Sequence, residues 1–374
     1  MTEILKVESK KDIKRFIDFP HDLYATDPHY VPELFLSQKD LLNPKVNPFF
    51  LHSEADLFLA IKGDKVVGRI AAIKNNNHIA YTDEQAGHFG FFEVIEDYEI
   101  AAKLLDTASN WIKDKGLDIL AGPTNFSTNE TCGTLVEGFD SSPTLMMPYN
   151  PAYYDEFLRK YGFDRDMDLL SYIIYAKDIP DKLISLNDKL LERLNSKGIT
   201  IRTANMKKFD EEVEKLFTIY NRAWEKNWGF VPMTEEEFKH TAKDMKLALD
   251  PDFLLIAEHD GEPIAFSLCL PDMNVAFKAV KRGRLLPFGI FKLLAQKRKI
   301  KKLRVLTLGI VEGYRRLGID AYFYMRSFVD AKRKNYDCGE ASWILENNEM
   351  MNKALVKING KVYKKHRLYK KSLN

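Results

Sequence analysis

The chain has 374 residues, of which 45% are hydrophobic and 12% are aromatic, a composition that is typical of globular proteins and excludes disordered and fibrous classes. Its length exceeds that of one ordinary core and predicts two domains. The formal net charge is only +2, so global charge disfavours nucleic acid as a partner and any basic surface must be local.

The cysteine and histidine patterns exclude the common metal and disulfide architectures. Cys132, Cys269 and Cys338 are widely separated, which excludes a CxxC metal knuckle and argues against a disulfide framework. The histidines show no HxxxH or HExxH spacing, so no metal site is expected. The start of the chain lacks the apolar run of a signal peptide, and no segment has the apolar length of a membrane span. We therefore expect a cytoplasmic protein.

The first half of the chain, residues 1–179, predicts a domain of alternating strands and helices. Two apolar runs flank the Gly63-Asp64 turn, which is typical of a β-hairpin over Ala55–Ile73. In chain order the predicted elements are a strand at Ile4–Val7, a helix from Lys11, the hairpin, the strand HFGFFEV, an amphipathic helix ending at Gly116, the strand LDILAGP, the helix PAYYDEFLRKYGF and the strand LLSYIIY.

The second half, residues 198–374, repeats this order. After a helical linker over residues 180–197 come the strand ITIRTA, the helix KKFDEEVEKLFTIYNRAWEKNW, a hairpin turning at Asp260-Gly261, the strand LRVLTLGIV, the helix DAYFYMRSFVDAKRKN, the strand GEASWILE, the helix NEMMNKALVKI and the strand GKVYKKHRLYKK. A hairpin followed by alternating strands and helices predicts a mixed α/β sheet flanked by helices. The fold class expected is thus two tandem α/β domains of the same kind.

The connection from the second hairpin to the strand LRVLTLGIV, residues 278–304, holds eleven Lys or Arg and no acid around the apolar stretch LLPFGIFKLL. A short helix with a solvated basic face explains it as well as a functional role does. The functional alternatives are an electrostatic funnel for a polyanionic ligand, a lid over a long acyl chain, or a surface for anionic lipid.

The sequence TLGIVEGYRRLGIDAYFY, residues 307–324, predicts an anion site. An apolar strand leads through a short basic loop into an amphipathic helix, so backbone N–H groups in the loop and at the helix start face outward with the positive end of the helix dipole behind them. Arg315 and Arg316 add positive charge, and Gly318 permits the close approach of a phosphate to the backbone.

This loop resembles that of the GNAT (acyl-CoA N-acyltransferase) superfamily, which reads Q/R-x-x-G-x-G/A. Arg315 and Gly318 match its first two defining positions, whereas Asp320 stands where a small residue is usual. The resemblance implies that acetyl-CoA or another acyl-CoA is the co-substrate. Its expected contacts are Leu308, Gly309, Ile310, Val311, Arg315, Arg316, Leu317, Gly318 and Ile319.

In such proteins the pantetheine arm pairs with the strand before the loop, and an N–H near Ile310 would polarise the thioester carbonyl. The acceptor amine must lose a proton to a base, and Glu312 is the candidate. In the alternative interpretation, Glu312 is only a solvated carboxylate of the loop. GNAT relatives often place a Tyr before a G-F pair, where it protonates the leaving thiolate. That Tyr has no counterpart here. Either Tyr363 replaces it as the acid, or the thiolate leaves without being protonated.

The first half lacks this loop but carries an insertion, residues 122–150, that resembles a GP-x-NFS-x-NE and EGFD segment of bacterial tandem GNAT proteins. In one interpretation, the polar residues of this insertion line an acceptor pocket, in which Glu130 or Glu137 binds a cationic amine or acts as base. In the other, they form hydrogen bonds to backbone groups of an unusual loop. The residues concerned are Asn125, Ser127, Asn129, Glu130, Glu137 and Asp140.

The sequence leaves three functions open. The first is acyl-CoA-dependent N-acyl transfer, most simply N-acetyl transfer, to a small-molecule amine. The second is a CoA-binding or sensory protein without catalysis, which Asp320 and the missing Tyr favour. The third is a peripheral-membrane long-chain acyltransferase or a Fem-like aminoacyl-tRNA-dependent transferase that uses residues 278–304.

Overall fold

The structure is a computed structural model that describes residues 1–179, 186–225, 227–246 and 248–373. Two compact units share the chain. Unit 1 comprises Met1–Leu169, Asn274–Arg298 and Lys364–Asn374, and unit 2 comprises Leu170–Met273 and Lys299–Tyr363. The units therefore differ from the two halves of the chain, because residues 274–298 and 364–374 belong to unit 1. The boundaries expected from the sequence, at 179 and 198, stay predictions.

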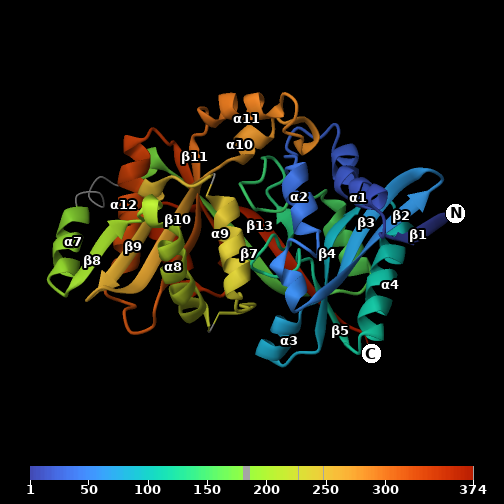
Figure 1. Cartoon of the computed structure of the whole chain (residues 1–374), viewed down its shortest axis with the longest axis horizontal. Helices are drawn as coiled ribbons and strands as arrows, with labels where there is room; N and C mark the ends of the chain where they lie inside the picture. Colours follow the sequence, from blue (N-terminus) through green and yellow to red (C-terminus); the bar gives the residue numbers. More distant parts are fainter. Residues whose placement is uncertain (180–185, 226, 247, 374) are drawn as a thin grey trace. The chain divides into compact units, whose positions relative to one another are not determined.

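Unit 1 contains an antiparallel hairpin followed by alternating helices and strands, as Figure 1 shows from the blue end of the ribbon. Its elements are β1 (Thr2–Lys6), α1 (Lys10–Leu23), α2 (Phe35–Leu41), β2 (Glu54–Lys62), β3 (Lys65–Lys74), α3 (Asn76–Thr82), β4 (Ala86–Val94), α4 (Tyr98–Asp114), β5 (Ile119–Gly122), β6 (Thr134–Glu137), α5 (Tyr153–Lys160), and α10 (Asn274–Phe277) with α11 (Gly289–Lys297) from the later segment. The strand β7 (Asp164–Tyr175) leads the chain into unit 2.

The sheet of unit 1 runs in the order β1-β2-β3-β4-β5 and ends on residues 369–372 of β13 (Lys361–Ser372). Neighbouring strands are antiparallel except β4 and β5, which are parallel. Alternate residues of β3 enter different cores: Ile70 packs with the side of the sheet that α4 covers, and Ala71 with the side that α1 covers. Successive side chains of a strand point to opposite faces of the sheet. Because both faces of β3 are buried, both sets of side chains are mostly apolar.

Unit 2 repeats the arrangement. Its elements are α7 (Asn187–Asn195), β8 (Ile199–Thr203), α8 (Phe209–Trp224), α9 (Glu235–Met245), β9 (Leu254–His259), β10 (Glu262–Pro271), β11 (Lys302–Ile310), α12 (Ile319–Arg333), β12 (Cys338–Leu345) and α13 (Glu349–Lys357). The strands lie in the order β8-β9-β10-β11-β12, and only β11 and β12 among these are parallel.

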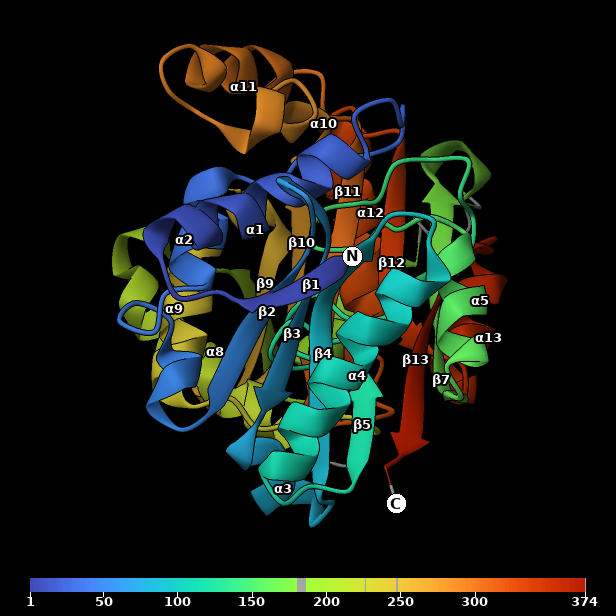
Figure 2. The ribbon, with the colours of Figure 1, turned by 90° about the vertical axis from the view of Figure 1, so that its right-hand side faces the viewer.

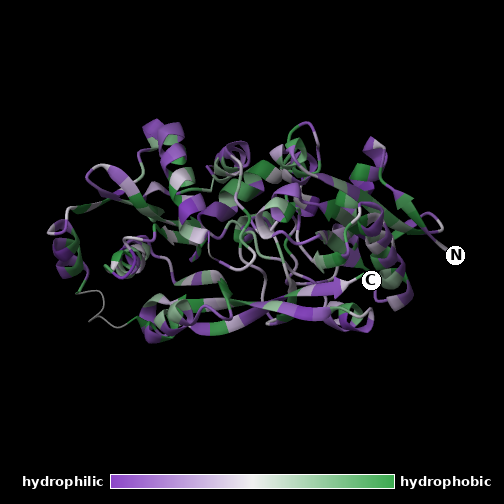
Figure 3. Cartoon of the chain, turned by 90° about the horizontal axis from the view of Figure 1, so that it is seen from below, coloured by the Kyte–Doolittle hydropathy of each residue, from purple (hydrophilic) through white to green (hydrophobic). Residues whose placement is uncertain are grey.

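Most helices carry hydrophilic and hydrophobic residues on the same element (Figure 3), as amphipathic helices against a sheet do. The segment 180–197, expected to be a helical linker, falls partly outside the described residues. Its described part contains α7, which is not a free connector, since its Leu194 is fully buried in a core shared with β8 and α12. The mixed α/β fold class predicted from the sequence is confirmed.

Four helices and one short strand were not expected from the sequence. They are α2, α3, α9, α10 and β6. The helix α9 begins with a complete capping box, in which Thr234 accepts from the N–H of Glu237 and the Glu237 carboxylate accepts from the N–H of Thr234. Its apolar residues Phe238, Ala242 and Met245 have helical spacing, but none of its described residues is buried, so the cap is its clearest signal.

Candidate functional site

The centre of the candidate site is the carboxyl end of β11, where the sheet of unit 2 opens. Parallel pairing joins β11 to β12 over Lys302–Val305 and Cys338–Ala341. Both strands continue beyond these residues, to Ile310 and Leu345. A bulge opposite Leu268 and Cys269 of β10 shifts the register of β11 just where this pairing stops. Because a bulge bends its strand, it accounts for the separation of β11 from β12.

The opened part of β11 directs polar backbone groups away from β10. The N–H of Val311 donates to the carbonyl oxygen of Ile264 at 2.9 Å. Bonded and non-bonded pairs alternate along an antiparallel ladder, so the next pair, Ala265 with Ile310, is a non-bonded one. The N–H groups of Ile310 and, two residues earlier, Leu308 therefore point to the side that β12 has left. An extended ligand can pair there as an added strand.

The loop after β11 leads to an uncapped helix start. Gly318, the N-cap residue of α12, has φ 95° and ψ 14°, and no side chain caps the helix. Among the described residues, the backbone N–H groups of Arg316, Leu317 and Gly318 have no hydrogen-bond acceptor, and the first N–H groups of any α-helix lack an intrahelical one. A cluster of uncommitted donors thus lies at the positive end of the α12 dipole, which is an anion-binding arrangement.

The two arginines of the loop have different surroundings. The guanidinium of Arg315 donates to the carbonyl oxygens of Ala223 at 2.7 Å and Ile310 at 3.3 Å. It fastens the loop to the end of α8, so its expected contact with phosphate stays a prediction. Arg316 is exposed and has φ 67°.

The acidic residues at the loop lie on either side of it. Glu312 is exposed two residues after Ile310, which agrees with the candidate base and equally with a solvated carboxylate. Asp320 lies half-buried in the first turn of α12. Its charge is favourable beside the helix dipole when no anion is bound and repels a bound phosphate.

One aromatic side chain closes the other face of β11. A Cβ at Gly309 would lie 2.3 Å from ring atoms of Trp224, so only glycine lets this ring pack on the strand. The neighbours Leu308 and Ile310 face the opposite side, in the core that contains Phe323 of α12. The structure thus places Trp224 directly against the opened strand.

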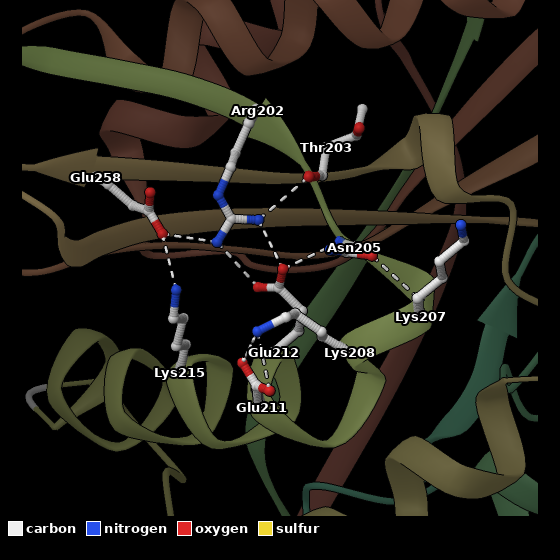
Figure 4. Close-up of polar contacts among 9 residues, drawn as sticks. All are labelled: Arg202, Thr203, Asn205, Lys207, Lys208, Glu211, Glu212, Lys215 and Glu258. Carbon is white, nitrogen blue, oxygen red and sulfur yellow. Dashed lines mark hydrogen bonds and ion pairs between the residues drawn. The ribbon is translucent and has the colours of Figure 1, made fainter.

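A charge network holds α8, and with it Trp224, against the sheet (Figure 4). Arg202 of β8 makes two hydrogen bonds to Glu212 of α8, at 2.7 and 3.0 Å, and one to Glu258 of β9 at 2.6 Å. Lys215 adds a bond to Glu258 at 3.1 Å. The Arg202 hydrogen bond lowers the pKa of Glu258, and the Arg202 bonds lower that of Glu212 although burial opposes this.

Tyr363, the alternative acid, lies at the far end of β11. Its hydroxyl donates to Glu340, whose register partner on β11 is Arg304. Six residues separate Arg304 from Ile310, which is about 20 Å along a strand at 3.3 Å per residue. Near Glu340, Lys302 also pairs with Asp272 at 3.1 Å. This position gives Tyr363 a structural partner and does not bring it to the opened end of the strand.

In unit 1 the corresponding opening is filled by the chain itself. There β4 pairs with β5 over Ala86–His88 and then shifts register against β3. The segment after β5 enters the gap: the N–H of Thr124 donates to the carbonyl oxygen of Phe89 at 2.8 Å, and the amide oxygen of Asn125 accepts from the N–H of Phe91 at 2.9 Å. The backbone donors and acceptors that a pantetheine arm would use are therefore taken.

The other residues of the insertion stabilise its loop or bind a neighbouring strand. The Ser127 hydroxyl accepts from the N–H of Asn129 at 3.2 Å, as in a serine turn. Glu137 of β6 pairs with Lys365 of β13 at 2.5 Å. Glu130 is half-buried, and Cys132 is buried. All belong to unit 1, so the acceptor pocket expected from Asn125, Ser127, Asn129, Glu130 and Glu137 stays a prediction.

Two further observations concern the described residues as a whole. No group of three or more His, Cys, Asp or Glu side chains is arranged to hold a metal ion in that part of the chain. No described helix has both the length and the hydropathy that crossing a membrane requires.

Comparison with known proteins assigns the fold and the family. No family model matches the chain. A tandem GNAT protein from the clavulanic acid biosynthesis pathway superposes with a TM-score of 0.60 at 10% identity, over 100% of this chain and 99% of its own. A GCN5-related N-acetyltransferase from Sphaerobacter thermophilus superposes with a TM-score of 0.53 at 12% identity, over 100% and 96%.

Two curated proteins are similar over their whole length. Protein YghO of Escherichia coli is 35% identical over 98% of this chain and 94% of its own. The bacterial ceramide synthase of Caulobacter vibrioides is 34% identical over 99% and 97%. The chain belongs to the family of these two proteins, and its fold is that of tandem GNAT proteins. The resemblance to GNAT proteins found in the sequence is confirmed at the level of the fold.

Proposed function

We propose that this tandem GNAT protein transfers a long-chain acyl group from acyl-CoA to the amino group of a long-chain amino alcohol. The helix start after Gly318, with its uncommitted N–H groups at the mouth of the opened β11, carries the acyl-CoA part of the proposal. The acceptor part rests on the ceramide synthase, which is 34% identical over nearly the whole chain, since a ceramide is such an amino alcohol acylated on nitrogen.

In the proposed reaction the pyrophosphate of CoA accepts hydrogen bonds from the start of α12. The pantetheine arm runs along Leu308–Ile310, where its amides pair with the outward-facing backbone groups. The N–H of Ile310 then donates to the thioester carbonyl oxygen and stabilises the negative charge that develops on it. Arg315 donates to the Ile310 carbonyl oxygen at 3.3 Å, so its guanidinium moves aside if the ligand uses that acceptor.

The bonds balance simply. The acceptor nitrogen attacks the thioester carbon, the C–S bond breaks, and the products are an amide and CoA thiol. The acceptor must be neutral to attack, so a base removes its ammonium proton, and Glu312 is the nearest carboxylate in sequence to Ile310. The thiolate leaves without an acid from Tyr363, because a thiol is acidic enough to tolerate this.

Two measurements test the proposal. Isothermal titration with acetyl-CoA and palmitoyl-CoA should show binding of both, tighter for the long chain; binding of neither contradicts the acyl-CoA site. Thiol release should then require a long-chain amino alcohol rather than a short amine such as ethanolamine. Binding without thiol release for any amine would favour the alternative, a CoA-binding protein without catalysis, which Asp320 beside the phosphate site supports.

The role of Glu312 has its own test. We expect Glu312→Gln to lower kcat about 100-fold, the usual scale for losing a general base, with acyl-CoA binding unchanged. Raising the pH should partly rescue this variant, because more acceptor is then neutral without help. The exposed Glu349 of α13 provides the control variant Glu349→Gln, which should keep full activity; equal activity of both variants contradicts the assignment.

A further inference from the structure

The segment 274–298 is fastened to unit 1 by ion pairs. Arg282 pairs with Asp22 at 2.5 Å and with Asp18 at 3.5 Å, and Arg284 pairs with Asp18 at 2.9 Å. Both acids lie on α1. The segment is thereby held in a defined position on α1, beside which α10 and α11 lie in Figure 2.

Its backbone fits the neighbouring chain closely. A Cβ at Gly283, where φ is 65°, would lie 1.8 Å from the carbonyl oxygen of Glu33, so only glycine permits this contact. The ammonium of Lys278 donates to the Ser142 hydroxyl at 3.0 Å. These contacts fix the base of the segment and leave the part from residue 285 onward to project from it.

The projecting part exposes large apolar side chains. The exposed fractions are 78% for Leu286, 70% for Phe288, 67% for Phe291 and 55% for Leu294. Residues three apart on a helix are neighbours on its surface, so Phe288 at the N-cap, Phe291 and Leu294 follow one broad side of α11, while Leu293 is its buried side chain. Within the described part of unit 1 these four exposed side chains form an apolar surface, a feature that marks interaction sites.

Exposed cations surround this apolar surface. Lys281, Lys292 and Arg298 are all exposed, and residues 278–304 include no acid at all. Charge complementarity therefore favours an anionic partner over a neutral one. Arg282 and Arg284 do not count toward this charge, because Asp18 and Asp22 compensate them.

We propose that residues 285–298 dock this protein onto the surface of an anionic lipid bilayer. Phe288, Phe291 and their apolar neighbours would enter the boundary between headgroups and acyl chains, and the cations would lie at the phosphate level, as in interfacial helices. A nucleic acid would also bind the cations, but it would not account for four exposed large apolar side chains beside them. The inference does not depend on the proposed transfer reaction.

Vesicle sedimentation tests the apolar contribution. The full chain should sediment with vesicles of phosphatidylglycerol and phosphatidylcholine, and less so at high salt because surface charges are screened. Phe288→Ser/Phe291→Ser should lower the partition coefficient at least 10-fold, since each buried Phe contributes strongly to transfer. Leu51 is also exposed, at 74%, so Leu51→Ser is the matched control and should bind as the unaltered chain does.

A second set of variants tests how much the cations contribute to vesicle binding. Lys281→Gln/Lys292→Gln/Arg298→Gln should lower the partition coefficient on anionic vesicles about 100-fold, because each cation near such a surface contributes roughly fivefold. The control, Lys353→Gln/Lys357→Gln/Lys361→Gln, makes the same change of charge on exposed residues of another region and should have little effect.

Three outcomes overturn the proposal: no sedimentation of the unaltered chain, equal loss in test and control variants, or binding of duplex RNA in place of vesicles. Circular dichroism and urea unfolding of each variant show whether it has folded. The vesicle measurement uses no acyl-CoA, so failure of the docking proposal and failure of the transfer reaction are seen separately.

Discussion

Gly318 determines whether the start of α12 is open to an anion. With φ 95° it adopts a left-handed conformation that most side chains disfavour, and an added Cβ would lie 3.1 Å from Leu190 of α7. A bulky side chain at this position would strain the backbone as well as block the site, and a binding measurement could not separate the two effects. Asn and Asp both tolerate this conformation and have the same shape, so comparing them isolates the charge.

We expect Gly318→Asp to bind acyl-CoA at least 10-fold more weakly than Gly318→Asn. Either side chain can cap α12, but only the carboxylate repels the pyrophosphate, by roughly 1–4 kcal/mol at about 4 Å. Isothermal titration at low ionic strength measures the difference, and equal stability in urea shows that folding is not the cause. Equal affinities of the two variants would place the phosphate elsewhere.

Glu93 of β4 is a second residue whose surroundings predict a measurable effect. Its carboxylate accepts from the hydroxyls of Tyr24 at 2.6 Å and Tyr154 at 2.8 Å, and Arg69 lies 4.0 Å away. Burial dominates and raises the pKa of Glu93 from 4.5 to about 7, although Arg69 and the hydroxyls oppose it. The folded chain therefore holds a proton there that the unfolded chain has already released.

Because the folded-state pKa is raised, this proton stabilises the fold at low pH and its contribution is lost as pH rises from about 4.5 to 7. Relative to Glu93→Gln, which keeps the shape without the charge, the free energy of unfolding should fall by up to about 3 kcal/mol across that window. Urea unfolding at several pH values measures it. Glu96 is exposed, and Glu96→Gln should show no such trend; parallel pH curves for the Glu93 variant and the unaltered chain would contradict the assignment.

At the scale of elements, the Arg202 network fixes the first turns of α8 on the sheet, and Trp224, which contacts Gly309, is the last residue of the same helix. Arg202 joins β8 and β9 to the first turns of α8 through Glu212 and Glu258 (Figure 4). Removing the arginine leaves two carboxylates near each other without their shared cation. Hydrogen bonds to charged groups contribute more to stability than bonds between neutral groups. Losing Arg202 therefore weakens the packing of β8, β9 and α8 together.

We expect Arg202→Met to lower the free energy of unfolding by about 2–3 kcal/mol at pH 7. The pKa values of Glu212 and Glu258 are lowered in the fold, so this stabilisation exists above their unfolded pKa of about 4.3 and is lost as pH falls through the folded values. The difference from the unaltered chain should therefore shrink below about pH 4. Lys207 is exposed nearby, and Lys207→Met should cost little; a pH-independent loss would instead indicate lost packing.

The sequence predicted those elements whose signals are local. Hairpins such as the one at Asp260-Gly261 and amphipathic helices such as α4 and α12 lie where their turns and apolar spacing place them. The loop at Arg315–Gly318 also follows from local chemistry. The contact of Trp224 with Gly309 and the insertion of Asn125 beside Phe91 depend on residues far apart in sequence, for which periodicity carries no signal.

For the whole molecule, duplication gives two openings of the same kind, and among the described residues a backbone segment of the chain enters the one in unit 1. In unit 1 Thr124 and Asn125 occupy the backbone positions that a pantetheine arm would need. A Cβ at Gly90 would lie 2.0 Å from the Thr124 carbonyl oxygen, so the inserted segment is packed against β4. Displacing it would leave several buried polar groups unpaired, at a cost of about 1–3 kcal/mol each.

We therefore expect one acyl-CoA per chain and not two. Isothermal titration should give a stoichiometry near one for the unaltered chain, and Gly318→Asp should reduce binding without leaving a second class of sites. Asn125→Ala removes only one of the blocking contacts, since the Thr124 N–H still donates to Phe89, and should create no new site. Two equivalents bound by the unaltered chain, or one equivalent retained at full affinity in Gly318→Asp, would show that unit 1 accepts the ligand and that its inserted segment gives way.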